Sequence, residues 1–196
     1  MDDILRRIAG LGPGRHVVAI AGAPGSGKST LAAELVAAVP GAVLVPMDGF
    51  HLDNRLLELD GLRPRKGAPE TFDAEGFVAL IRRLKQGGEV VYPVFDRQRD
   101  LAIAGAGRVA AQTGLVVVEG NYLLLDRAPW RGLAGLWDLS VMLEVPAEEL
   151  RRRLTARWQG LGQSPAEVLA HLENDLANAE TVAGRSLPAD IRLTNV

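Results

Sequence analysis

Short apolar runs alternate with longer amphipathic segments along this chain. Several of the runs are apolar at every position, which is typical of strands buried on both faces of a sheet. The runs expected to form one sheet are residues 17–21, 43–45, 90–95, 115–118 and 139–145, with a last short strand at 190–193. This alternation predicts an α/β fold with a mostly parallel sheet.

The amphipathic segments between the runs are expected to be helices. They cover residues 28–39, 77 to about 86, 146–158 and 164 to about 180. In the second, apolar residues recur at i, i+3, i+4 and i+7 from Phe77, and in the last, Ser164 and Glu167 form a capped start. Pro146 suits the first turn of the third helix.

The segment between the first strand and the first helix fits the pattern GxxxxGK(S/T) of a phosphate-binding loop. Glycines let backbone N–H groups surround phosphate oxygens, and the following helix presents its positive end. Lys28 is expected to reach the β and γ phosphates and the Ser29 hydroxyl to bind Mg²⁺. The sequence therefore predicts ATP and Mg²⁺ as ligands, with a plain glycine-rich turn as the alternative. The nucleotide-binding residues are expected to be Gly22, Ala23, Pro24, Gly25, Ser26, Gly27, Lys28, Ser29 and Thr30.

Acidic residues come directly after three of the apolar runs, at Asp48, Asp96 and Glu119, and Arg97 follows Asp96. Ligands of open α/β sheets bind beyond the carboxyl ends of the strands, so these side chains are expected to face the phosphate loop. Asp48, followed by a flexible glycine, is the candidate base for an acceptor hydroxyl, and Glu119 is the candidate Mg²⁺ ligand. Arg97 is expected to hold the acceptor. The alternative for each residue alone is a turn former.

Arg153 and Arg157 are i, i+4 neighbours on the third helix and are expected to close over the γ phosphate as lid residues. A solvated basic face is the alternative. His51 either contacts the acceptor or packs against its apolar neighbours.

His16 and His171 have no partners at metal-ligand spacing and are expected at the surface. Trp130 and Trp137 are expected in the core or in a docking contact, and not as platforms for a base.

Composition and charge narrow the class of protein. With 196 residues, 47% of them hydrophobic, the chain is expected to form one domain over residues 1–196. The 22 basic and 24 acidic residues leave a net charge of -2, which argues against nucleic acid as a partner. The lack of cysteine excludes disulfides and cysteine nucleophiles. No signal peptide or long apolar span is visible, so a cytoplasmic protein without a membrane partner is expected, and a homodimer stays open.

Five segments together resemble P-loop kinases of the phosphoribulokinase, uridine kinase and bacterial pantothenate kinase superfamily. They are the phosphate loop, MDGFH at 47–51, RKGAPETFD at 65–73, PVFDR at 93–97 and EGNYLL at 119–124, and they are most similar to those of short bacterial nucleoside- and fructose-kinase-like members. The resemblance implies a three-layer P-loop kinase fold with a five-stranded parallel sheet and a helical lid. It also implies Asp48 as catalytic base and Lys66 and Asp73 on the acceptor side, although Asp73 could instead cap a helix.

The expected function is transfer of the ATP γ phosphate to a hydroxyl of a sugar, a nucleoside or a vitamin-like molecule. The catalytic residues are expected to be Lys28, Asp48, Arg153 and Arg157, and the acceptor-side residues Asp48, His51, Lys66, Asp73, Arg97, Glu119, Asn121 and Tyr122. The alternative is a regulatory or accessory protein that hydrolyses a nucleotide without an acceptor, although the chain has no guanine-reading NKxD segment. The sequence does not name the acceptor.

Overall fold

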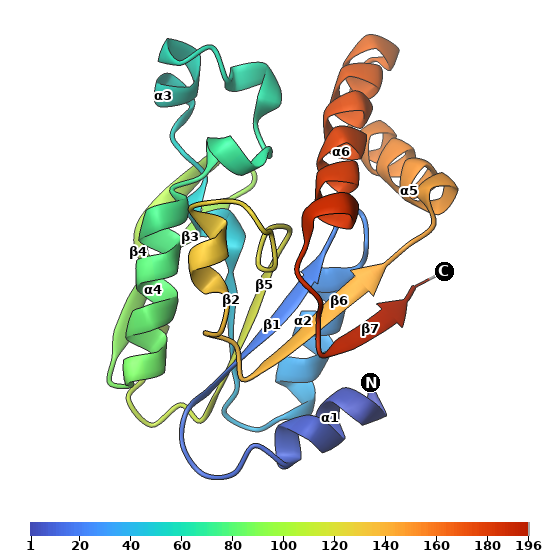
Figure 1. The fold of residues 1–196 in the computed structure, drawn as a ribbon. Coiled ribbons are helices and arrows are strands. Elements are labelled where there is room, and N and C mark those ends of the chain that lie inside the picture. Colours follow the sequence, from blue (N-terminus) through green and yellow to red (C-terminus); the bar gives the residue numbers. More distant parts are fainter. Residues whose placement is uncertain (196) are drawn as a thin grey trace.

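The structure is a computed structural model that describes residues 1–195, and Figure 1 shows its fold. The strands are β1 (His16–Gly22), β2 (Val43–Pro46), β3 (Val90–Asp96), β4 (Leu101–Val109), β5 (Leu115–Gly120), β6 (Leu139–Glu144) and β7 (Ile191–Thr194). The helices are α1 (Asp2–Ala9), α2 (Lys28–Ala38), α3 (Asn54–Leu59), α4 (Ala74–Gln86), α5 (Ala147–Gly160) and α6 (Pro165–Arg185). Four 3₁₀ turns, η1 (Met47–Phe50), η2 (Arg63–Arg65), η3 (Pro69–Thr71) and η4 (Trp130–Leu133), connect them.

Five parallel strands form the central sheet in the order β2-β5-β1-β6-β7. Alternate residues of β1 enter different cores: Val17 and Ala19 pack with α4 on one face, and Ile20 packs with α1 and α2 on the other. Burial on both faces explains why the central strands are apolar at every position. The predicted three-layer α/β fold with a five-stranded parallel sheet is confirmed.

The prediction that residues 90–95 join this sheet is wrong. They belong to β3, which pairs antiparallel with β4 in a separate two-stranded sheet, and β7 takes the fifth place in the main sheet. A short apolar run looks the same in a buried parallel strand and in one arm of a hairpin, so the run alone could not distinguish them. The Tyr92 hydroxyl donates to the Leu44 carbonyl at 2.9 Å and so fixes this hairpin beside β2.

The two helices α5 and α6 form the expected helical layer near the phosphate loop. Ser164 and Glu167 complete a capping box at the start of α6, and Leu150 and Leu154 of α5 pack with Leu172 of α6. In Figure 1 this pair and α3 rise at the same end of the central sheet. Within residues 1–195, no helix is both long enough and apolar enough to cross a membrane.

Candidate active site

The phosphate-binding loop connects β1 to α2. Gly25 and Gly27 have φ values of 77° and 88°, a region that side chains with a Cβ rarely adopt, so the loop needs glycine at both positions. No side chain caps the start of α2, which leaves its first N–H groups for a ligand. The geometry therefore forms an anion-binding cradle of the kind that holds nucleotide phosphates.

Two residues from distant parts of the chain brace this loop. The Asn195 amide, which follows β7, donates to the Ser26 carbonyl at 2.8 Å, and a Cβ at Gly27 would lie 2.6 Å from the same amide nitrogen. Arg153 of α5 donates to the Gly25 carbonyl at 3.5 Å and to Glu149 at 2.6 Å. Arg153 therefore supports the phosphate loop from the side of α5.

Ser29 and Glu119 link the start of α2 to the end of β5. The Ser29 hydroxyl donates to the Glu119 carboxylate at 3.1 Å, and the Glu119 side chain is buried. Burial raises the pKa of Glu119, with the Asp48 charge in the same direction, while Lys28 and the Ser29 hydroxyl oppose the rise. A hydroxyl and a carboxylate side by side are oxygen donors that suit Mg²⁺, and phosphates and water commonly complete its shell.

Asp48 lies in η1, directly after β2, and is paired with Arg97. The Arg97 guanidinium donates to its carboxylate at 2.7 Å, while the Arg97 side chain stays 62% exposed. Gly49, the residue after Asp48, lies against β3. A Cβ at this position would lie 2.1 Å from the Pro93 carbonyl oxygen, so only glycine fits there. The structure thus gives Gly49 a packing role that the sequence did not predict, because the missing side chain lets β3 pack closely on η1.

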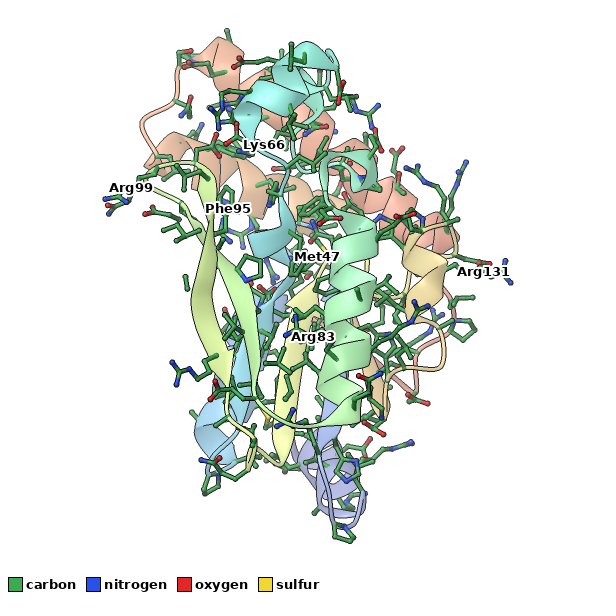
Figure 2. All side chains as sticks on the ribbon, turned by 90° about the vertical axis from the view of Figure 1, so that its left-hand side faces the viewer. Met47, Lys66, Arg83, Phe95, Arg99 and Arg131 are labelled. Carbon is green, nitrogen blue, oxygen red and sulfur yellow. The ribbon has the colours of Figure 1, made fainter. Side chains whose placement is uncertain are left out.

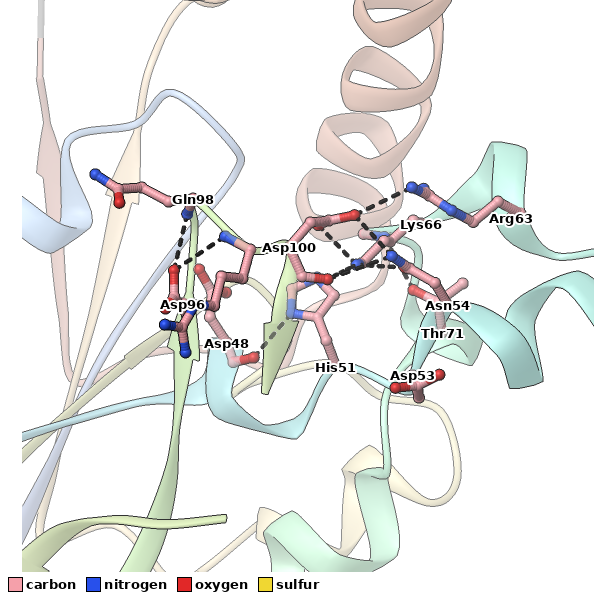
Figure 3. A network of polar contacts seen from close by, with 12 residues as sticks. Asp48, His51, Asp53, Asn54, Arg63, Lys66, Thr71, Asp96, Gln98 and Asp100 are labelled. Carbon is pink, nitrogen blue, oxygen red and sulfur yellow. Dashed lines mark hydrogen bonds and ion pairs between the residues drawn. The ribbon is translucent and has the colours of Figure 1, made fainter. Parts of the chain in front are cut away.

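A polar network surrounds Lys66 (Figure 3), and Figure 2 shows Lys66 and Phe95 at the same end of the molecule, above Met47. The Lys66 ammonium donates to the Asn54 side chain at 2.7 Å, to the Asp100 carbonyl at 3.0 Å and to the Asp100 carboxylate at 2.7 Å. These three contacts use all of its N–H groups. Arg63 contacts the same carboxylate at 3.1 Å.

Three aromatic rings pack against one another beside this network. The His51 ring centroid lies 4.0 Å from that of Phe72 and 4.7 Å from that of Phe95. Burial lowers the pKa of His51, although Asp48 opposes this, so the ring is expected to be neutral near pH 7. Its Nδ1 donates to the Asp48 carbonyl at 2.9 Å and thereby holds η1 in place.

A single cavity of about 1060 Å³ joins the phosphate loop, Asp48 and the rings of His51, Phe72 and Phe95. The predicted site residues that line it are Pro24, Gly25, Gly27, Lys28, Ser29, Thr30, Asp48, His51, Lys66, Arg97, Glu119, Asn121 and Arg157. A volume in this range is at the upper end of small-molecule sites. The fold therefore provides one compartment in which a phosphate donor and an acceptor can meet.

Comparison with known proteins identifies the family of this chain. The model of the phosphoribulokinase / uridine kinase family matches residues 17–176. The chain belongs to this family. It is 39% identical over 185 residues to an uncharacterized Escherichia coli protein, YggC, covering 90% of this chain and 76% of that protein. It is 34% identical over 196 residues to a Schizosaccharomyces pombe protein named "Putative uridine kinase", covering 91% and 83%.

A solved structure supports the same assignment. The crystal structure of a "putative fructose transport system kinase" from a Silicibacter species shares 51% identity and a TM-score of 0.91 with this chain, covering 98% of this chain and 96% of that one. The names of these relatives differ in the acceptor, so the phosphoribulokinase / uridine kinase family assignment fixes the type of enzyme more closely than its substrate.

Some of the residues that the sequence predicts for the active site do not line the cavity. The Asp73 carboxylate accepts the Gly76 N–H at 2.9 Å and caps α4, and Tyr122 is buried, with its hydroxyl donating to the Gly67 carbonyl at 2.6 Å. Gly22, Ala23, Ser26 and Arg153 form the frame of the loop and do not line the cavity either. Burial raises the pKa of Tyr122, so its hydroxyl remains a donor to this carbonyl.

Three residues of α6 that the sequence did not predict for the site also line the cavity. His171, which was expected at the surface, stacks on Trp158 with ring centroids 4.0 Å apart and lines the cavity with Asn174 and Asp175 of α6. The expectation for His171 is wrong because α6 folds back over the site. Their i, i+3, i+4 spacing is the one local signal that these three residues share a helix face. Trp130 is buried in the core, as predicted.

Proposed function

We propose that this member of the phosphoribulokinase / uridine kinase family transfers the γ phosphate of ATP to a hydroxyl of a small molecule. The observation that carries this proposal is that Lys28, Asp48 and Glu119 line the same cavity, which also contains the phosphate loop. Phosphoryl transfer requires positioning, neutralisation of charge and a group that takes the proton of the nucleophile.

In the proposed reaction, the acceptor hydroxyl oxygen attacks the γ phosphorus while its proton passes to the Asp48 carboxylate. The bond from the γ phosphorus to the bridging oxygen breaks, and ADP leaves. Arg97 orients the Asp48 carboxylate, and Lys28 and Arg157 compensate charge on the transferred group. Mg²⁺, held by Ser29 and Glu119 together with the phosphates, would supply further charge compensation.

The other residues have supporting roles in this proposal. The phosphate loop, from Gly22 to Thr30, binds the nucleotide, and Arg153 braces it from α5. His51 and Asn121 line the acceptor side of the cavity, while Lys66 holds the network that forms its wall. Tyr122 and Asp73 support the segments around it from the core and from the start of α4.

The first experiment measures ADP release with ATP and a panel of nucleosides, sugars, pentose phosphates, pantothenate and other vitamins. Stimulation by one class of acceptor is the expected result. ATP hydrolysis that no acceptor stimulates would instead favour a nucleotide-hydrolysing regulatory or accessory protein.

The second experiment tests the base. Asp48→Asn should lower turnover with the best acceptor by about 10²- to 10⁴-fold, because the general base is lost, while ATP binding stays within about twofold. Asp60→Asn, an exposed acid at the end of α3, is the matched control and should retain full turnover. Normal turnover in Asp48→Asn would contradict the assignment of Asp48.

A further inference from the structure

Helix α6 contributes a polar face to the cavity. His171, Asn174 and Asp175 line it, and Leu172 anchors the helix against α5. The Asn174 amide donates to the Lys66 carbonyl at 2.9 Å. This bond fixes the α6 face relative to the acceptor side of the cavity.

Asp175 is the acid of this face. The Trp158 indole N–H donates to one of its carboxylate oxygens at 2.9 Å. Within residues 1–195, no basic side chain lies in ion-pair contact with Asp175. Burial raises the pKa of its carboxyl group, while the Trp158 hydrogen bond and the charges of Arg157, His171 and Lys28 oppose the rise. A partly buried carboxylate at a cavity wall is best satisfied by a hydrogen-bond donor inside the cavity.

Three of the cations that line the cavity are paired with acids of the chain, whereas Lys28 and Arg157 are assigned to the transferred phosphate. Lys66 and Arg63 contact Asp100, and Arg97 contacts Asp48. Asp100 has a φ of 53°, an uncommon conformation for a residue with a side chain, and it places its carboxylate and its carbonyl on Lys66. An acidic acceptor would have to displace one of these carboxylates and would also meet Asp175.

We propose that Asp175, together with Asn174, binds hydroxyl groups of the acceptor and selects an uncharged, polyhydroxylated molecule over a phosphorylated or carboxylated one. This inference rests on the proposed function, because it assigns a substrate class and a specificity residue to the same cavity. A carboxylate accepts hydrogen bonds from sugar or ribose hydroxyls, whereas it repels an anion.

The test compares Asp175→Asn with the wild type, using uridine, D-ribose and D-fructose as uncharged acceptors and pantothenate and ribose 5-phosphate as anionic ones. Asn keeps an oxygen for the Trp158 N–H, so the fold is retained, but it loses the charge. The KM of the best uncharged acceptor should rise roughly 10- to 100-fold, the range expected when a hydrogen bond to a charged group is lost. The Kd of ATP should stay unchanged, and the melting temperature should not fall. Glu173→Gln, an exposed acid two residues earlier on α6, is the matched control and should keep the wild-type KM.

A second readout does not depend on turnover. Trp158 lines the cavity and contacts Asp175, so binding of an uncharged acceptor should change tryptophan fluorescence in the wild type, and this change should be lost in Trp158→Phe. An unchanged KM in Asp175→Asn, a preference for anionic acceptors, or a loss confined to ATP binding would each overturn the assignment while the kinase function stands. If no acceptor stimulates ADP release from the wild type, the proposed function fails and this inference fails with it.

Discussion

Glu119 and Asp175 share a property that distinguishes them from the acids on the surface of this protein. Burial raises the pKa of each carboxyl group, and neither forms an ion pair within residues 1–195. A buried carboxylate without an ion-pair partner costs folding stability. Such groups are therefore expected where a bound ligand supplies the missing cation or hydrogen-bond donor. Both face the cavity that joins the phosphate loop to the acceptor side.

Glu119→Gln is expected to raise stability and lower activity together. The pKa of Glu119 in the folded chain lies above its ordinary value of 4.5, so the folded state binds the proton more tightly and stability falls as pH rises through this region. Removing the charge should stabilise the free protein at pH 7 by about 1 kcal/mol, or about 2–4 °C in melting temperature. Thermal melts at pH 7 and pH 4 measure this, and the gain should shrink at the lower pH.

Activity assays complete this prediction. The Mg²⁺ concentration for half-maximal turnover should rise in Glu119→Gln, since a neutral amide binds a divalent cation less well than a carboxylate does. Glu34→Gln, an exposed acid on α2, should change neither property. A variant that is less stable than the wild type and fully active would show that Glu119 serves the fold and not the site.

At the scale of elements, the sequence predicts those parts of the fold whose signals are local. The phosphate loop with its flanking strand and helix, the apolar stripe that begins at Phe77, and the capping box at Ser164 all lie within short windows. The helices α1 and α3 and the strand β4 were not predicted. The strand β4 is rich in alanine and glycine and mostly exposed, so its pairing with β3 is decided by contacts that no local pattern records.

Some residues of the candidate site could be predicted from the sequence, and others could not. Asp48 and Glu119 could be found because the ends of parallel strands converge at one edge of the sheet. Asp100 and Asp175 could not, since one depends on a turn with positive φ and the other on the angle at which α6 folds over the cavity. Asn195 is a lone polar residue after β7, and its support of the phosphate loop follows only from the position of β7 beside β6.

Asp138 links β1 to α4, so replacing it tests how much this link contributes to stability. It accepts the Val17 N–H of β1 at 2.7 Å, and Lys85 of α4 contacts both of its carboxylate oxygens, at 2.6 and 2.7 Å. Burial alone would raise the pKa of Asp138, but the hydrogen bonds from Lys85 and Val17 and the charges of Lys85 and His16 hold it below its ordinary value. Asp138→Asn should therefore destabilise the protein at pH 7 by about 1–2 kcal/mol.

The stabilisation that the Asp138 carboxylate provides depends on pH. A lowered pKa means that the stabilisation is present above the ordinary value of 3.8 and is lost as pH falls through the pKa of the folded state. Urea unfolding at pH 7 should show the full difference between Asp138→Asn and the wild type, and at pH 3 the difference should be smaller. Asp60→Asn should show no difference at either pH. An equal loss at both values would mean that the charge of Asp138 is irrelevant.

At the scale of the whole molecule, the cavity is assembled from separate parts of the fold. The central sheet supplies the phosphate loop, Asp48 and Glu119; the segment around α3 and η2 supplies Lys66 and Arg63; and α5 and α6 close the opposite side. The Asn174 amide joins the last two by a hydrogen bond to the Lys66 carbonyl. A nucleotide that contacts the loop, Glu119 and α5 at once is therefore expected to stabilise the molecule as a unit.

This expectation can be measured as a ligand-dependent shift in melting temperature. A ligand that binds only the folded state adds about 2.7 kcal/mol at a concentration one hundred times its Kd, or about 5–10 °C for a chain of this size. A non-hydrolysable ATP analogue with Mg²⁺ should produce this shift in the wild type. Lys28→Ala should retain the melting temperature of the free protein but lose more than half of the shift, because it removes the cation that contacts the terminal phosphates. Arg83→Ala, which changes an exposed residue of α4 (Figure 2) that does not line the cavity, should keep the full shift. An equal shift in Lys28→Ala and the wild type would show that the analogue binds without the loop lysine, and the nucleotide would then have to be placed elsewhere in the cavity.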